Sequence, residues 1–223
     1  MTPTLSVLAR RSVLRQPGLL ARRVRALMLG FAAVLAVLAQ MLALPARAAQ
    51  PANPIGGVRF EPKLQLGGQA LVLNGTGLRA RLIFKAYAAA LYLPQPASTA
   101  DTVVALVGPK RLQIRMLFGV PAQEFVKAFH LGLERNLPAD QQAGLAERAA
   151  RFDAMLKPLG ELKDGDTVNL DFLPGQGLLF AVNGRLLGAP IPGEDFYGAL
   201  LRVFVGEKVS DDRLRAGLLG NPG

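Results

Sequence analysis

Residues 78–93 read LRARLIFKAYAAALYL, and this stretch does most to decide the fold. Apolar and polar side chains alternate along its first part, with Ala80, Leu82, Phe84 and Ala86 on one face and Arg79, Arg81, Lys85 and Tyr87 on the other. A period of two residues indicates a β-strand that is covered on one side. The alanine-rich end is also compatible with a helix, and Pro94 and Pro96 close the segment. We therefore predict one long strand over residues 78–93.

Working outward from this strand, the sequence predicts strands, then helices, then strands, then helices. Gly67-Gly68 and Asn74-Gly75-Thr76-Gly77 are typical of turns, so residues 63–66 and 69–73 should form a hairpin. Side-chain periodicity and the positions of proline and glycine predict strands over residues 110–117, 167–173, 178–182 and 185–187, and helices over residues 100–107, 121–136, 138–156, 194–205 and 210–218, the last capped by Ser210. This order predicts an α+β fold, with a large antiparallel sheet and a layer of helices on one face.

The first 48 residues have the three-part pattern of a bacterial secretory signal. Basic residues precede the uncharged run ALMLGFAAVLAVLAQMLAL at residues 26–44, and Pro45-Ala46-Arg47-Ala48 offers small residues to signal peptidase. We expect passage through the export machinery, cleavage after about Ala48 and a periplasmic location. An uncleaved anchor is the alternative, because 19 apolar residues can span a bilayer. Arg10-Arg11 is compatible with twin-arginine export, so the sequence leaves both Sec and twin-arginine routes open.

The part that follows the signal is close to neutral. The 223-residue chain has a formal net charge of +10, but seven of its 26 basic residues lie before Ala49, which leaves 19 against 16 acidic residues. Such mixed charge gives no footprint for a nucleic-acid partner. The absence of cysteine and the single histidine, His130, exclude disulfides, thiol chemistry and a histidine-rich metal site. We expect no cofactor and no metal, a flexible segment over residues 49–57, and one domain over residues 58–223 that does not span a membrane.

Two short motifs are interpreted as turns. Residues 75–80, GTGLRA, match the GxGxxA spacing of dinucleotide-binding proteins, but that chemistry needs a helix after the glycines, and a strand pattern follows here. Asp164, Asp166 and Asp171 form an acidic cluster without the remaining ligands of a calcium loop, and Asp164-Gly165-Asp166 is typical of a turn.

Arg79 and Tyr87 lie in phase on the polar face of the predicted strand. An arginine fork binds a carboxylate through two hydrogen bonds, and a tyrosine hydroxyl can add a third. An ordinary solvated strand face is the alternative, and it also explains Arg81 and Lys85. Taken without further context, the residues favour the solvated face.

Two blocks resemble the chalcone isomerase family in its broad sense, which includes plant enzymes, fatty-acid-binding relatives and exported bacterial members. The first comprises residues 73–79, LNGTGLR, followed by Phe84-Lys85-Ala86-Tyr87 and Ala90-Leu91-Tyr92-Leu93. The second comprises residues 199–210, ALLRVFVGEKVS, and runs on through Leu214. The resemblance covers essentially the whole chain after the signal. It implies a large antiparallel sheet, a layer of helices, and a ligand cleft between them.

The resemblance also implies site residues. The family's arginine after the Gly-x-Gly run falls on Arg79, where it would hold an anionic or carbonyl oxygen, and a hydroxyl-bearing position falls on Tyr87. The polar groups of the enzymes are missing elsewhere, because their tyrosine falls on Phe125, their asparagine on Gly132 and their Ser/Thr on Val203. Convergence of Arg79 and Tyr87 requires a bend, since eight steps of unbroken strand span roughly 26 Å.

The leading hypothesis is an exported chalcone-isomerase-like protein that does no chemistry and binds a fatty acid or a similar small amphiphile in the cleft. Arg79 and Tyr87 would contact the head group, and the tail region would be lined by Phe125, Phe129, Val203 and Phe204. The alternative is an isomerase or intramolecular lyase that acts on a conjugated carbonyl compound through Arg79 and Tyr87. A second alternative is a periplasmic interaction or assembly factor whose cleft is filled by its own side chains.

Overall fold

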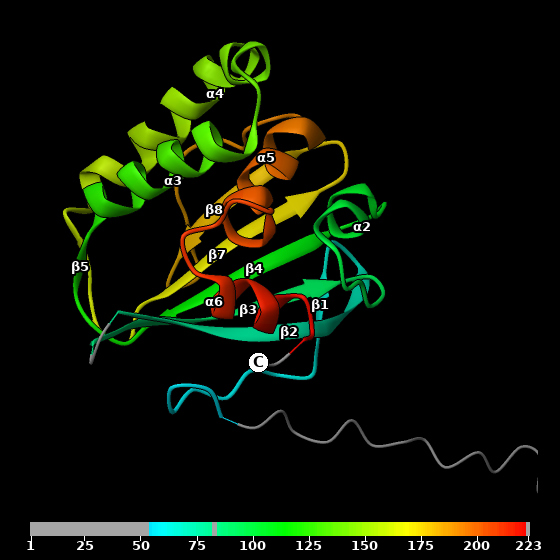
Figure 1. Cartoon of the computed structure of the whole chain (residues 1–223), viewed down its shortest axis with the longest axis vertical. Helices are drawn as coiled ribbons and strands as arrows, with labels where there is room; N and C mark the ends of the chain where they lie inside the picture. The colour runs from blue at the N-terminus through cyan, green and yellow to red at the C-terminus, as the bar shows by residue number, and fades with distance from the viewer. Residues whose placement is uncertain (1–53, 82–83, 222–223) are drawn as a thin grey trace, which may run out of the picture. The chain divides into compact units, whose positions relative to one another are not determined.

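The protein is built on a seven-stranded antiparallel sheet. A computed structural model describes residues 54–81 and 84–221. The sheet order is β1-β2-β3-β4-β7-β8-β9, so sheet neighbours follow one another along the chain except at the step from β4 to β7 (Figure 1). The bounds are β1 Lys63–Leu66, β2 Gln69–Arg81, β3 Phe84–Leu93, β4 Lys110–Met116, β7 Thr167–Leu173, β8 Gly177–Val182 and β9 Arg185–Leu186. A separate short pair, β5 Val120–Pro121 and β6 Glu161–Leu162, joins the two ends of the helical excursion between β4 and β7.

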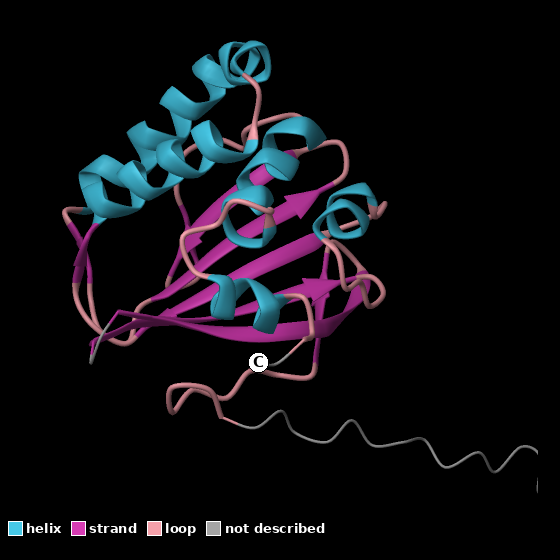
Figure 2. Cartoon of the chain, viewed as in Figure 1, coloured by secondary structure: helices cyan, strands magenta, loops and turns pink. Residues whose placement is uncertain are grey.

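The described helices gather on one face of this sheet (Figure 2). Helix α3 shows why, because Val126, Phe129 and Leu133 recur at helical spacing and are all buried. The bounds are α2 Ala100–Ala105, α3 Ala122–Asn136, α4 Ala139–Leu156, the 3-10 turn η1 Lys157–Leu159, α5 Glu194–Val205 and α6 Asp212–Leu218. This arrangement confirms the predicted α+β fold.

Strand β3 is buried on both of its faces. Its odd-numbered residues from Ala89 to Leu93 pack into the main core under the helices. Its even-numbered residues, Ala88 to Tyr92, belong to a second apolar cluster on the other face of the sheet, where Ile55, Val58 and Phe60 of the N-terminal segment pack against them. A strand that is covered on both faces carries apolar side chains on both, which accounts for the loss of polar and apolar alternation over residues 88–93.

The turn predicted at Asn74-Gly75-Thr76-Gly77 is wrong, because β2 runs through it. A Cβ atom on Gly77 would stand 2.6 Å from the carbonyl oxygen of Leu214, and one on Gly75 would stand 2.8 Å from that of Leu218. The two glycines therefore let the backbone of α6 approach the strand closely. Gly75 and Gly77 therefore do not form a turn but make room for helix α6.

The single strand predicted over residues 78–93 is also wrong. It is two strands, β2 and β3, which pair antiparallel with Arg81 opposite Phe84 and Arg79 opposite Tyr87. Residues 82–83 lie outside the described residues, and their Leu-Ile sequence carries no glycine, proline, asparagine or aspartate to mark a turn. Polar residues recur at odd positions from Arg79 to Tyr87 in the sequence, which hid the reversal. In the structure Ala80 lies opposite Lys85 and Arg81 opposite Phe84, so the predicted division of the two faces does not hold across the turn.

The strand predicted over residues 69–73 begins as expected but continues to Arg81, and the remaining predicted strands and helices agree with the structure to within two residues at each end. The predicted cap Ser210 is one residue off: Asp211 caps α6 by accepting a hydrogen bond of 3.0 Å from the backbone N–H of Leu214. The predicted signal over residues 1–48 lies outside the described residues, and the segment 49–57 is described only from residue 54 onward.

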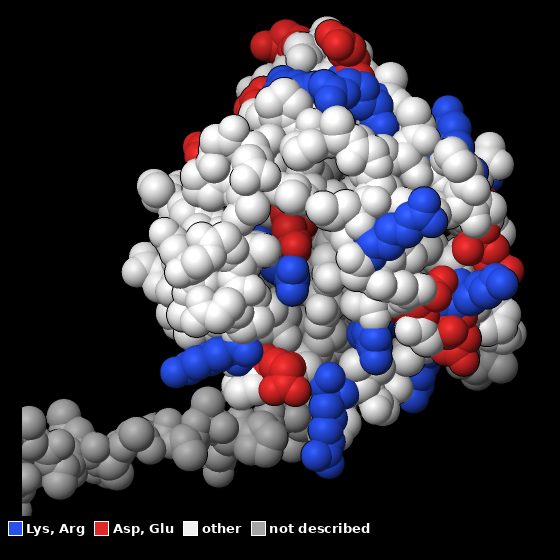
Figure 3. All heavy atoms as spheres, turned by 180° about the vertical axis from the view of Figure 1, so that it is seen from behind, with Lys and Arg blue, Asp and Glu red and all other residues white. Residues whose placement is uncertain are grey.

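Two further observations concern the described helices and one face of the surface. None of the helices within residues 54–81 and 84–221 has the length and apolar character needed to cross a membrane. The view from behind, in Figure 3, shows acidic and basic side chains interspersed over a largely uncharged surface. Neither sign dominates this face.

Candidate functional site

A cavity of about 430 Å³ lies between the sheet and the helices α3 and α5. This volume falls within the range of roughly 300 to 1,000 Å³ that is usual for small-molecule sites. Its walls come from β2, β3, β4, β7 and β8 on one side and from α3, α5 and residues 208–211 on the other, with further residues from α4, α6 and the β5–β6 pair. The structure brings all six predicted ligand-binding residues together in these walls: Arg79, Tyr87, Phe125, Phe129, Val203 and Phe204. Their contact with a ligand stays a prediction.

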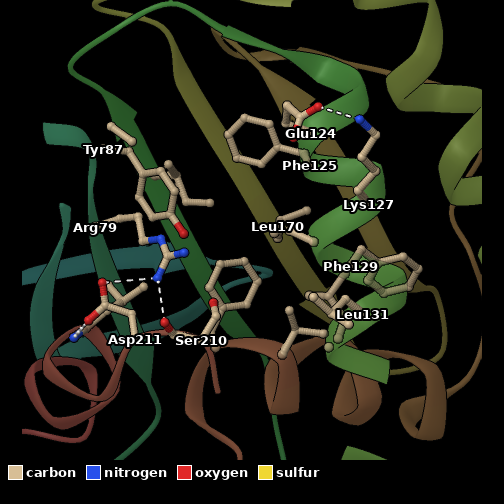
Figure 4. A pocket seen from close by; sticks show the side chains of 18 of the residues that line it. Arg79, Tyr87, Glu124, Phe125, Lys127, Phe129, Leu131, Leu170, Ser210 and Asp211 are labelled. Atoms are coloured by element: carbon tan, nitrogen blue, oxygen red, sulfur yellow. Dashed lines mark hydrogen bonds and ion pairs between the residues drawn. The ribbon is translucent and has the colours of Figure 1, made fainter. Parts of the chain in front are cut away.

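The polar end of the cavity is formed by Arg79 and Tyr87. They are direct cross-strand partners on β2 and β3, so the hairpin supplies the bend that the sequence required. Such partners have Cβ atoms only about 5 Å apart, and Figure 4 shows the Tyr87 hydroxyl pointing toward the Arg79 guanidinium. Burial raises the pKa of Tyr87 to about 12, while Arg79 lowers it and Asp211 raises it further. At neutral pH this hydroxyl is therefore an uncharged hydrogen-bonding group.

Arg79 already has partners within the protein. Its Nη1 donates a hydrogen bond of 3.0 Å to the backbone oxygen of Ser210 and lies 3.2 Å from Oδ2 of Asp211. Asp211 was not among the residues predicted for this site. The sequence did contain a signal. Asp211 is of a residue type that caps helices, it directly follows residues 199–210 of the family resemblance, and the helix that it begins could pack on the strand that carries Arg79.

The loop of residues 206–211, which forms part of the cavity wall, is held at a second point by Asn136 at the end of α3. The Asn136 amide donates to the backbone oxygens of Gly132 (2.9 Å) and Lys208 (3.3 Å) and accepts from the N–H of Lys208 (3.1 Å). The loop is thus fixed by α3 on one side and by Arg79 on the other. The sequence analysis missed Asn136 as well.

The opposite end of the cavity is aromatic. Phe129 packs edge-on against Phe152 (ring centroids 5.0 Å apart) and Phe196 (6.1 Å), and Phe152 packs against Phe180 (5.5 Å). The three phenylalanine pairs are edge-to-face, and such pairs add stability beyond the area they bury. Nearer to Arg79, the rings of Tyr87 and Phe125 are tilted by 32° with their centroids 6.1 Å apart. The end of the cavity across from Arg79 is therefore apolar.

Residues 52–220 match the sequence profile described as chalcone isomerase-like. The chain belongs to the chalcone isomerase-like family. A search of curated proteins gave no match. Among solved structures, the chain is similar to the crystal structure of a fatty-acid binding protein of Arabidopsis thaliana, with a TM-score of 0.56 and 18% identity over 76% of this chain and 95% of that one. This likeness and the profile match confirm the family resemblance and its fold.

Gly132 and Val203, two positions at which the family resemblance implied polar groups in the enzymes, touch each other in this chalcone isomerase-like chain. A Cβ atom on Gly132 would stand 2.6 Å from Cγ1 of Val203, so α3 and α5 approach closely at this point. There is no room for an asparagine at position 132 while valine occupies position 203. The third position, Phe125, adds a ring to the same wall. These replacements make the middle of the cavity apolar.

The described residues bring no group of three or more His, Cys, Asp or Glu side chains together as a metal site. His130 pairs instead with Asp153, with Nε2 2.9 Å from Oδ2, and half of its side chain is exposed. The GxGxxA spacing at residues 75–80 lies inside β2, where no helix follows the glycines to bind a pyrophosphate. Asp164-Gly165 does form the predicted turn.

Proposed function

We propose that this domain binds a fatty acid or a similar small amphiphile, with its tail in the cavity and its head group at Arg79 and Tyr87, and that it does no chemistry on it. The observation that carries the proposal is an apolar cavity of about 430 Å³ with an arginine and a tyrosine paired at one end. The structural neighbour is named as a fatty-acid binding protein, which supports the same class of ligand.

Apolar burial would supply most of the affinity. Each methylene group moved from water into such a site contributes about 0.8 kcal/mol. The aromatic end around Phe129, which is 4% exposed, offers that environment. Arg79 and Tyr87 would orient the ligand through hydrogen bonds to its head group, so that the tail enters first.

Binding without catalysis is favoured by the positions of Phe125, Gly132 and Val203. All three line the cavity, and none has a hydroxyl or amide that could position a nucleophile or a water molecule. An interaction factor whose cleft is filled by its own side chains is disfavoured by the volume of the cavity. The isomerase alternative predicts turnover of a conjugated carbonyl compound, which an absorbance assay would detect.

We also propose that residues 1–48 act as a secretory signal and that the domain works in the periplasm. The support is the sequence pattern of basic residues, apolar run and small residues before Ala49. N-terminal sequencing of protein from a periplasmic fraction should begin at about Ala49. A chain that begins at Met1 and stays in the membrane fraction would contradict this proposal.

The binding proposal is tested by filling the cavity. Ala128 lies on α3, is exposed and lines the cavity, whereas Ala146 lies exposed on α4 and outside it. In calorimetric titrations with dodecanoate and 1-dodecanol, Ala128→Trp should weaken binding at least about tenfold. This is the effect expected if the indole ring displaces two methylene groups of the ligand from the cavity. Ala146→Trp should bind as the wild type does. Equal affinities in both variants would place the ligand elsewhere, and a wild type that binds neither compound would overturn the proposal.

A further inference from the structure

The positive charge at the head-group end is already matched by a negative one. Asp211 Oδ2 lies 3.2 Å from Arg79 Nη1, and the Asp211 side chain is only 14% exposed. Asp211 is held there independently of Arg79, because its Oδ1 caps α6 by accepting from the N–H of Leu214 at 3.0 Å. The guanidinium and this carboxylate together form a neutral pair beside the cavity.

A second carboxylate at Arg79 would meet the charge of Asp211. Two carboxylates on one guanidinium lie within about 6 Å of each other, the range in which like charges disfavour a second ionised group. The surroundings include the apolar cavity walls, where such repulsion is screened less than in water. The pair therefore opposes an anionic head group.

The other charged residues of the cavity wall do not change this balance. Glu124 and Lys127 form an ion pair with each other at 2.7 Å, and both are exposed. Arg135 and Lys208 are exposed at the rim. Solvent and salt screen such surface charges strongly. Among the charged residues of the wall, Asp211 is therefore the one that acts on the head-group site at close range.

Arg79 and Tyr87 still offer hydrogen-bond donors at the head-group end of the cavity. Within the described residues, the polar contacts of Arg79 all start from Nη1, while a guanidinium has five N–H groups on three nitrogens. The Tyr87 hydroxyl points toward the same guanidinium (Figure 4). We propose that Asp211 makes this site selective for amphiphiles with an uncharged oxygen acceptor in the head group, such as an ester, an alcohol or a protonated acid, over carboxylates.

This inference rests on the proposed amphiphile binding, and a substitution at Asp211 tests it separately. Asp211→Asn removes the charge and keeps a good N-cap, since asparagine caps helices about as well as aspartate. Asp211→Ser is a second neutral cap in case the first variant folds poorly. Asp212→Asn is the matched control, because Asp212 is the exposed acidic neighbour in the first turn of α6.

The experiment is calorimetric titration of protein expressed from the full-length sequence, at pH 8, with dodecanoate and 1-dodecanol. Asp211→Asn should strengthen dodecanoate binding about tenfold, the effect of removing one close like charge, and should leave 1-dodecanol unchanged within about twofold. Asp212→Asn should change neither. Each variant is compared with the wild type for the same ligand. The affinities of the two ligands are not compared directly, because the alcohol is more apolar than the anion in any site.

Three outcomes would overturn the inference. An equal dodecanoate affinity in wild type and Asp211→Asn would show that Asp211 does not act on the head group. A loss of dodecanoate affinity in Lys208→Gln would place the anion at the exposed rim. If the wild type binds neither compound, the proposed function fails, and the selectivity fails with it.

Discussion

Two arginine–aspartate pairs in this molecule differ in geometry and in surroundings. Arg111 on β4 and Asp171 on β7 are cross-strand partners, joined by two hydrogen bonds of 2.6 Å from Nε and Nη2. Arg79 on β2 reaches Asp211 through Nη1 alone, at 3.2 Å. The first pair lies between strands, beside the Gln113–Asn169 hydrogen bond of 2.9 Å, and the second lies at the wall of a cavity.

The difference distinguishes a pair that holds the fold from a pair that is available to a ligand. In the Arg111–Asp171 pair both carboxylate oxygens are used, the side chains are 19% and 11% exposed, and the hydrogen bonds with Asp171 raise the pKa of Arg111. A bidentate pair of this kind is the strongest form of the interaction. Arg79 is 30% exposed and keeps donor groups near the cavity. Both pairs consist of an arginine and an aspartate, and the geometry of each pair in the structure distinguishes them.

The largest expected effect is on stability. Asp171→Ala leaves the charge of Arg111 largely buried without its partner, which should lower the free energy of unfolding by about 3 kcal/mol. Asp211→Asn should cost less than about 1 kcal/mol, because it removes one partly exposed contact and keeps the cap. Urea unfolding of both variants measures the difference. Equal losses would contradict the distinction between the two pairs.

A smaller effect is expected from moving α6 without touching either pair. Gly77→Ala places a Cβ atom 2.6 Å from the carbonyl oxygen of Leu214, and such overpacking costs about 2 kcal/mol. Because α6 holds Asp211 beside Arg79, drawing α6 away from β2 should strengthen dodecanoate binding and leave 1-dodecanol binding unchanged within about twofold. Gly144→Ala on α4 is the control, since nothing lies within 4 Å of its added Cβ. An unchanged Gly77→Ala variant would show that the close approach of α6 to β2 is not required.

Alkaline pH should weaken the fold through tyrosines near both pairs. The pKa values of Tyr87 and Tyr92 are raised by burial to about 12, and burial also raises that of Tyr197. An unfolded chain releases these protons near pH 10, before the folded chain does. The free energy of unfolding should therefore fall between about pH 10 and pH 12. Each Tyr→Phe variant should flatten that slope in unfolding curves, and an unchanged slope in all three would contradict the assignment.

The smallest expected effect concerns the head group. Tyr87→Phe removes one hydrogen-bond donor, which should weaken 1-dodecanol binding about fivefold, corresponding to about 1 kcal/mol. Tyr92 belongs to the apolar cluster on the other face of the sheet. Tyr92→Phe should therefore bind as the wild type does. Equal affinities for Tyr87→Phe and wild type would remove the hydroxyl from the site.

The sequence predicted those features that depend on local periodicity. Helix α3 shows this, because side-chain periodicity and Pro121 predicted a helix over residues 121–136 and the structure has it at Ala122–Asn136. The sequence did not predict the features that depend on contacts between residues far apart in the chain. Gly75 and Gly77 pass for turn residues until α6, about 140 residues later, packs against them. The partners of Arg79 are equally remote, with Ser210 lying 131 positions away.

The central claim is that the cavity holds an amphiphile, and mass spectrometry of organic extracts from the purified protein tests it most directly. We predict that wild-type protein carries a small amphiphile in near-stoichiometric amount. Arg79→Ala should lose it, because the head group loses its donor and Asp211 is left beside the cavity without Arg79. A wild-type extract without any amphiphile would contradict the claim.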